Sequence, residues 1–181
     1  MPAPQHLSTD QLEAALPNLR DTPREAGILE MIVRRPAEDE REELVEAGLS
    51  LSEGLLGDNW SRGKANPLCQ LTLMNARAAQ LVGQSRDRWA LAGDQLYVEF
   101  DLSDAHLPAG TRIAIGEEAV VEVTPEPHTG CEKFISRFGL EAMKFVNSTE
   151  GRSLNLRGIN TRVVQPGTIR RGDPVVRLSE T

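Results

Sequence analysis

The sequence contains few aromatic residues and no long apolar segment, and both shortages limit what the protein can be. Only 4% of its 181 residues are aromatic, so the core must rest on Val, Leu, Ile and Ala. No stretch approaches the roughly 20 apolar residues that a membrane-spanning helix requires. The N-terminus lacks the basic and apolar regions of a signal peptide. We therefore expect a cytoplasmic protein that does not enter a membrane.

Cysteine and histidine are also scarce, which excludes the common zinc modules. The two cysteines form no CxxC pair, and with three histidines they give no zinc-finger spacing. In a reducing compartment both cysteines are expected to be free thiols. Cys69 lies among apolar residues of a predicted strand, so we expect it to be buried in the core.

Basic residues are in the minority, and their distribution is uneven. The net charge is −7; residues 1–60 carry 13 acids against 5 bases, whereas residues 131–181 carry 5 acids against 9 bases. An acidic protein binds nucleic acid poorly, because that affinity depends on neutralising phosphates. The basic last third can still hold one small anionic ligand.

Apolar segments rich in β-branched residues, separated by turn signals, dominate the chain. The predicted strands lie within residues 27–35, 69–74, 95–102, 111–124 and 159–178. The fourth range is a hairpin around Gly116, and the last contains turns at Pro166-Gly167 and Gly172-Asp173. This pattern predicts a mainly β fold, a decorated β-barrel with short inserted helices. We expect residues 1–26 to form an N-terminal extension and residues 27–181 to form the barrel domain.

Helices are expected at the N-terminus and in the segments between the strands. Ser8 and Gln11 form a capping box, Asn75 is placed to cap a helix, and Cys131 opens another. The residues after that last helix, 140–147, suggest a further helix. The charged residues 37–49 are also expected to be helical, ending at Gly48. Residues 50–67 are interpreted as a long loop.

Cys131 is the most interesting candidate for chemistry. It follows a turn-rich segment and opens a predicted helix, where free backbone N–H groups stabilise a thiolate. Lys133 and a protonated His128 would act in the same direction. Such a thiolate suits persulfide chemistry or ligation of a soft metal. Each residue also has an alternative interpretation without chemistry. Cys131 could instead be a buried structural thiol, and His128 a loop residue without a chemical role.

The tract after residue 150 is rich in arginine and asparagine. The guanidinium groups of Arg157 and Arg162 can bind the oxygens of a phosphate. The amide of Asn160 offers a paired donor and acceptor for the polar edge of a planar ligand. The alternative is a solvated strand-and-turn surface. The chain has no P-loop and no strand-linked GxGxxG, so it gives no motif for a nucleotide-binding fold.

Five segments in order resemble a MOSC domain, the module named for its place at the C-terminus of molybdenum cofactor sulfurases. They are GLLGDNW, QLTLMN, GDQLYVEFDLSDAHLPAGTRIAIG, VEVTPEPHTGCEKF and RGINTRVVQPGTIRRGDPV. The resemblance extends over most of the chain, from about Ile28 to Leu178. It implies a β-barrel related to that of pyruvate kinase and a stand-alone member of the family.

The resemblance also implies a function in molybdenum cofactor (molybdopterin) or sulfur chemistry. The cysteine of the family corresponds to Cys131, with Lys133 at a position just after it. Cys131 would then be the catalytic residue and the ligand of molybdenum. His128, Lys133, Arg157, Asn160 and Arg162 would contact the cofactor.

Three functional hypotheses follow. In the first, the protein is a molybdenum-dependent reductase subunit acting on N-hydroxylated compounds, as in relatives resembling the mitochondrial amidoxime-reducing component, with a separate redox partner. In the second, Cys131 carries a persulfide received from a separate pyridoxal-phosphate cysteine desulfurase, without bound metal. In the third, the barrel is a non-catalytic interaction module. The sequence leaves open whether the protein is an enzyme.

Overall fold

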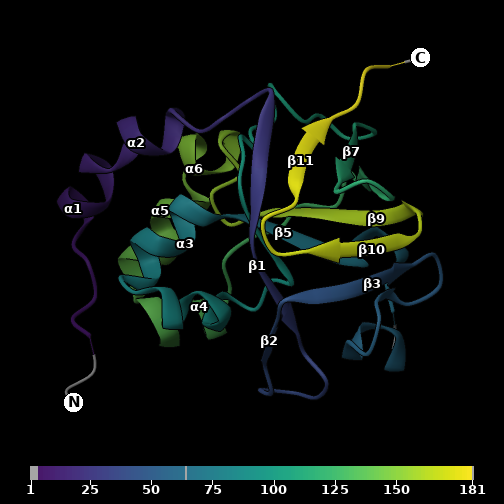
Figure 1. Cartoon of the computed structure of the whole chain (residues 1–181). Helices are drawn as coiled ribbons and strands as arrows, with labels where there is room; N and C mark the ends of the chain where they lie inside the picture. Colours follow the sequence, from purple (N-terminus) through teal and green to yellow (C-terminus); the bar gives the residue numbers. More distant parts are fainter. Residues whose placement is uncertain (1–3, 64, 181) are drawn as a thin grey trace.

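The architecture is a closed, mixed β-barrel with helices along one side (Figure 1). It is seen in a computed structural model that describes residues 4–63 and 65–180. In this part of the chain the barrel strands follow the order β1-β11-β7-β8-β9-β5-β6, and β6 pairs with β1 to close the ring. They are β1 (Ala26–Arg34), β5 (Leu71–Asn75), β6 (Leu96–Glu99), β7 (Arg112–Ile115), β8 (Ala119–Val123), β9 (Ile159–Gln165) and β11 (Pro174–Arg177). The predicted decorated β-barrel is therefore confirmed.

Strands β5 and β6 are buried on both faces, because one face lines the barrel and the other lies under the helices. Leu73 and Leu96 belong to the apolar cluster inside the barrel. Met74 and Tyr97, the residues that follow them, belong to a second cluster beneath the helices. This explains why these strands are nearly continuous apolar segments without polar alternation.

The segment after β1 corrects one prediction. Residues 37–49 were expected to be helical, but they form a turn followed by β2 (Glu42–Leu44) and most of β3 (Glu46–Ser50). Strand β3 pairs with β10 (Gly167–Arg170) and β4 (Gly54–Leu55) in a small second sheet. Ala47 and Leu49 are buried there, and their spacing of two is the period of a strand. Tertiary burial of these two residues outweighs the helix propensity of the surrounding glutamates.

The helices form a layer along one side of the barrel, on the left in Figure 1. They are α1 (Thr9–Ala14), α2 (Leu16–Arg20), α3 (Ala76–Gly83), α4 (Glu132–Phe138), α5 (Leu140–Asn147) and α6 (Thr149–Ser153). The capping box at Ser8 and the cap at Asn75 form as predicted. Leu12 and Leu19, from the predicted extension, are buried in the cluster beneath these helices. The domain boundary at residue 26 stays a prediction.

Three short 3₁₀ helices complete the described part of the chain: η1 (Asn59–Arg62), η2 (Pro67–Cys69) and η3 (Arg86–Ala92). The segment expected to be a loop, residues 50–67, thus contains β4 and η1. Cys69 ends η2 instead of starting β5, and it is half-buried, so the prediction of a core cysteine is wrong. Of the described helices, none has the length and apolar character to cross a membrane.

Candidate functional site

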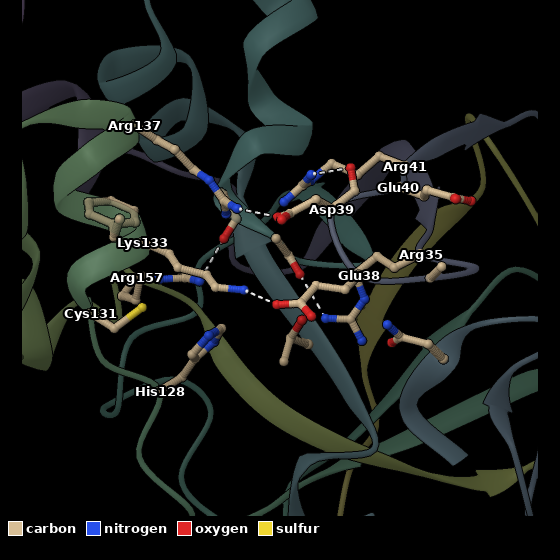
Figure 2. Close-up of a pocket in the computed structure, with 16 residues that line it drawn as sticks. Arg35, Glu38, Asp39, Glu40, Arg41, His128, Cys131, Lys133, Arg137 and Arg157 are labelled. Carbon is tan, nitrogen blue, oxygen red and sulfur yellow. Dashed lines mark hydrogen bonds and ion pairs between the residues drawn. The ribbon is translucent and has the colours of Figure 1, made fainter. Parts of the chain in front are cut away.

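Four connecting segments meet at one end of the barrel around a cavity of about 270 Å³. They are the β1–β2 loop, the link between η3 and β6, the link between β8 and α4, and the link between α6 and β9. Figure 2 shows the lining side chains, among them Cys131 and several cations. A second cavity of about 220 Å³ adjoins it, and His128 and Arg157 line both.

Cys131 is the N-cap residue of α4 and is exposed. Its side chain caps no backbone N–H group, so the sulfur is not used to end the helix. The helix is anchored by Phe134 and Phe138, whose rings lie 4.8 Å apart and are buried beneath the helical layer. The Phe spacing of four residues in the sequence thus fixes which face of α4 is buried. Cys131 is left at the mouth of the cavity.

Two asparagines hold the segment that leads to Cys131. Asn160, on β9, donates from Nδ2 to the carbonyl oxygens of Glu126 and Pro127. Asn147, at the end of α5, accepts from the Gly130 N–H at 2.8 Å and donates to its carbonyl oxygen at 3.2 Å. The residues before Cys131 are therefore attached both to the barrel and to the helical layer. Asn147 has no signal in the sequence that distinguishes it from a solvent-exposed helix residue.

Asp94 is the buried acid of the site, and its side chain is fully inaccessible to solvent. Arg157 Nη1 donates to Asp94 Oδ2 at 2.6 Å, and Arg157 Nη2 donates to the Ala92 carbonyl oxygen at 2.8 Å. The Arg157 guanidinium also lies 5.3 Å from the centre of the Phe134 ring. The arginine is thus compensated by charge and by an aromatic face.

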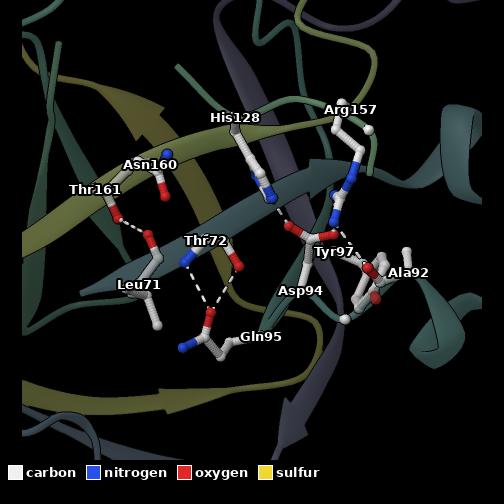
Figure 3. A network of polar contacts seen from close by, with 12 residues as sticks. Leu71, Thr72, Ala92, Asp94, Gln95, Tyr97, His128, Arg157, Asn160 and Thr161 are labelled. Atoms are coloured by element: carbon white, nitrogen blue, oxygen red, sulfur yellow. Dashed lines mark hydrogen bonds and ion pairs between the residues drawn. The ribbon is translucent and has the colours of Figure 1, made fainter. Parts of the chain in front are cut away.

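His128 lies on the other side of Asp94 (Figure 3). Its Nδ1 is 3.4 Å from Asp94 Oδ1, and neither atom has a hydrogen-bond partner. Burial lowers the pKa of His128 to about 4, although the Asp94 carboxylate opposes this effect. The imidazole is therefore neutral at pH 7, and the expected support of a thiolate by protonated His128 is not available. We call Asp94, His128 and Arg157 the buried wall.

Arg35 is fixed in a similar way by a buried carboxylate. Its Nε and Nη2 donate to the two oxygens of Asp58 at 3.0 and 2.8 Å, a bidentate geometry. Asp58 also caps η1 by accepting from the Trp60 N–H. This contact explains the Gly-Asp segment of the long loop: its acid attaches the loop to the end of β1.

The rim opposite the buried wall is acidic. Residues 38–40 of the β1–β2 loop are Glu38, Asp39 and Glu40, which we call the acidic loop. Glu38 accepts from Lys133 Nζ at 3.0 Å, and Asp39 accepts from Arg137 Nη2 at 3.2 Å. Their side chains are 79% and 67% exposed. These pairs connect the loop to two successive turns of α4 across the cavity.

Arg41 completes the set of cations. It forms no ion pair with a carboxylate in the described residues, and its Nε is buried without a partner. Burial and the neighbouring charge of Arg137 lower its pKa. The cavity is lined by five cationic side chains, Arg35, Arg41, Lys133, Arg137 and Arg157.

Most of the residues singled out in the sequence come together here. His128, Cys131, Lys133 and Arg157 line the first cavity, and Asn160 lines the second. Arg162 lines neither; it projects from β9 and pairs with Glu122 on β8. Sequence reasoning missed Asp94, Arg35, Arg41, Arg137 and the acidic loop. Asp94 had one usable signal, an acid directly before an apolar strand, but its buried partner is 63 residues away.

The sequence profile of the MOSC domain matches residues 74–176, more than half of the chain. The protein is thus a member of the MOSC domain family, as the resemblance implied. A search of curated proteins finds no match to this chain.

Solved structures agree on the fold. The YuaD protein of Bacillus subtilis aligns with a TM-score of 0.64 at 16% identity, over 88% of this chain and 100% of that one. YiiM from Escherichia coli aligns with a TM-score of 0.57 at 18% identity, over 85% and 71%. YiiM from Geobacillus stearothermophilus gives 0.56 at 16% identity, over 84% and 75%. At these identities the comparison establishes the barrel and nothing about activity.

Proposed function

We propose that the protein handles sulfur at Cys131, in the chemistry associated with molybdenum cofactor sulfurases. The observation that carries this proposal is the position of Cys131. Its thiol is exposed, forms no disulfide and caps no backbone N–H group, and it lies at the mouth of a cavity lined by five cationic side chains. A thiol that packed the core or capped a helix would be unsuited to this task.

A persulfide is the simplest group that such a site can carry. A separate pyridoxal-phosphate cysteine desulfurase would present its own cysteine persulfide to the cavity. The Cys131 thiolate attacks the outer sulfur, the sulfur–sulfur bond of the donor breaks, and the desulfurase cysteine leaves as a thiolate. Exposure of Cys131 is what allows a protein donor to reach it.

The test is intact mass after incubation with a cysteine desulfurase and free cysteine. The wild type gains the mass of one sulfur atom, and Cys131→Ser gains none. Cys69→Ser is the matched control and loads like the wild type. Burial, followed by the charge of Glu126, raises the pKa of Cys69, which disfavours its thiolate. Equal loading of Cys131→Ser and the wild type would overturn the proposal.

A second candidate is binding of the molybdenum cofactor, and the two adjoining cavities favour it. Within the described residues no group of three or more His, Cys, Asp or Glu side chains could hold a metal ion. A metal that arrives with its own ligands, as in a pterin cofactor, needs only a single thiolate from the protein. Cys131 is a suitable soft donor.

The residues of this chain fit such a group. Lys133 supplies positive charge for a phosphate, and Arg157 Nε, His128 Nδ1 and Asp94 Oδ1 are buried polar atoms without partners. Bound molybdenum would supply redox chemistry and would require a separate redox partner. Elemental analysis of protein from a molybdenum-replete host tests this: near-stoichiometric metal in the wild type and loss in Cys131→Ser are expected. Protein without molybdenum from that host would contradict it.

A further inference from the structure

The cations of the cavity fall into two groups that differ in what neutralises them. Two are permanently compensated by buried carboxylates: Arg35 by Asp58 and Arg157 by Asp94. The other three, Arg41, Lys133 and Arg137, face only the acidic loop or have no carboxylate partner in the described residues. Arg41, Lys133 and Arg137 are therefore the three cations that can bind an anionic ligand in this cavity.

The contacts of the acidic loop are weak enough to be exchanged. Glu38 and Asp39 are mostly exposed, and ion pairs between exposed side chains typically contribute about 0.2–1 kcal/mol each. Arg137 is different, because its Nη1 also donates to the Leu91 carbonyl oxygen and its side chain is only 19% exposed. When a competing anion enters the cavity, Glu38 and Asp39 can release their cationic partners, while the contact with Leu91 keeps Arg137 in place.

Resting on the sulfur chemistry proposed for Cys131, we propose that this cavity also binds small sulfane-sulfur donors with an oxyanion head. Thiosulfate is the simplest member of that class. Its sulfonate-like oxygens are acceptors for Arg41, Lys133 and Arg137, and its outer sulfur is the atom that Cys131 takes. Arg157, with a 9% exposed side chain and an Nε that lacks a partner, adds a buried donor to the same cavity.

The transfer balances without a further oxidant or reductant. The Cys131 thiolate, whose proton has gone to water, forms a bond to the outer sulfur of thiosulfate. The sulfur–sulfur bond of thiosulfate breaks, and sulfite leaves with the electron pair. Cys131 is left as a persulfide, and cyanide can remove its outer sulfur as thiocyanate to restore the thiolate.

The charges explain why this reaction needs such a cavity. A thiolate and a thiosulfate dianion bring three negative charges together, both before and after the transfer. Repulsion between like charges a few ångströms apart is strong in a partly dry site. Arg41, Lys133 and Arg137 can offset these three charges once the acidic loop has released Lys133 and Arg137, and the Leu91 carbonyl oxygen holds Arg137 in position before the substrate arrives.

The experiment measures thiocyanate formation from thiosulfate and cyanide, together with the intact mass after thiosulfate alone. The wild type gains one sulfur and turns over, while Cys131→Ser does neither. Arg41→Gln and Lys133→Gln raise the KM for thiosulfate at least about tenfold, the scale of one lost charged hydrogen bond. Glu38→Gln combined with Asp39→Asn lowers the KM about two- to fivefold per pair removed. Arg162→Gln, a surface arginine outside the cavity, leaves the KM unchanged and serves as the control.

The outcomes separate this inference from the proposed function. Loading of Cys131 by a desulfurase but not by thiosulfate overturns the inference and leaves the persulfide carrier standing. The inference is also overturned if thiosulfate loads Cys131 but its KM is the same in the wild type, Arg41→Gln and Lys133→Gln, because the cations then do not select the donor. Failure of both donors overturns both proposals.

Discussion

The buried wall and the acidic loop border the same cavity and use the same types of ion pair, yet they differ in burial. Asp94 is fully buried and holds Arg157 at 2.6 Å, whereas Asp39 is 67% exposed and holds Arg137 at 3.2 Å. A buried pair that loses one partner leaves an uncompensated charge in a medium that cannot solvate it. An exposed pair that loses one partner leaves a charge that water solvates.

The difference separates what maintains the site from what can respond to a ligand. The buried wall holds the η3–β6, β8–α4 and α6–β9 segments together through Asp94, His128 and Arg157. Among the described residues, the carboxylates of the acidic loop pair with α4 alone, through Lys133 and Arg137, and both acids are largely exposed. Ligand-induced change is therefore expected on the side of the acidic loop, with the buried wall fixed.

The largest expected effect comes from breaking the buried pair. Asp94→Asn keeps the shape of the side chain but leaves the charge of Arg157 buried and uncompensated. We expect a loss of about 3–5 kcal/mol in the free energy of unfolding. Asp39→Asn is the matched control and is expected to lose at most about 1 kcal/mol. Urea unfolding of both variants measures the difference, and equal losses would remove the distinction between the two sides.

Gly158 gives the next largest effect, because it packs against the buried wall. Its φ is +118°, and a Cβ there would lie 2.5 Å from the Leu73 carbonyl oxygen and 3.3 Å from Asp94 Oδ1. Gly158→Ala should cost about 2–3 kcal/mol through combined strain and overlap. Gly172 has φ +94° but no heavy atom within 4 Å of an added Cβ. Gly172→Ala should therefore show only the backbone component, about 1 kcal/mol, in the same urea titration.

His128 makes the stability of the buried wall depend on pH. Burial lowers its pKa from 6.5 to about 4 in the folded protein, with Asp94 opposing and the charges of Arg157 and Arg35 assisting. Between these two values the unfolded chain binds the proton and the folded chain does not, so stability falls as the pH falls. The loss is about 1.4 kcal/mol per pH unit.

His128→Gln provides the comparison, because it removes the titrating group. Urea unfolding from pH 7 to pH 4 should show a steeper loss of stability in the wild type than in the variant, starting near pH 6.5. Parallel curves would mean that the imidazole is solvated in the folded protein, and that the buried wall is more open than its distances indicate.

The sequence was sufficient for the barrel because local patterns determine most of it. The hairpin at Gly116, the cap at Asn75 and the helix after Cys131 depend on neighbouring residues, and all three form. The prediction of a helix at residues 37–49 was wrong because strand pairing decides the structure there: β2 pairs with the end of β1, and β3 pairs with residues 167–170, far along the chain. Composition favours a helix there, and only the tertiary pairing overrides it.

The sequence predicted those site residues whose chemistry follows from the residue type and its neighbours in the chain. It did not predict those whose role depends on an ion pair with a distant residue. Cys131, Lys133 and His128 are close in sequence, so their proximity could be expected. The Asp94–Arg157 pair and the contact of Asp39 with Arg137 join residues separated by 63 and 98 positions. Nothing in one sequence shows which of 27 acids meets which of 20 bases.

Arg162 is expected to have the smallest effect, and it tests the boundary of the site. It belongs to the same basic tract as Arg157, five residues away, but its side chain is 49% exposed. Its Nη2 donates to Glu122 Oε1 at 2.7 Å, and this bond is the main reason that the pKa of Glu122 is lowered. Arg162→Gln should therefore raise the pKa of Glu122 in an NMR titration and change the free energy of unfolding by at most about 1 kcal/mol. It should leave sulfur loading and molybdenum content as in the wild type, since the side chain lines neither cavity. If Arg162→Gln lost either property, the ligand would have to extend along β9 beyond the cavities, and the site would be larger than the buried wall and the acidic loop define.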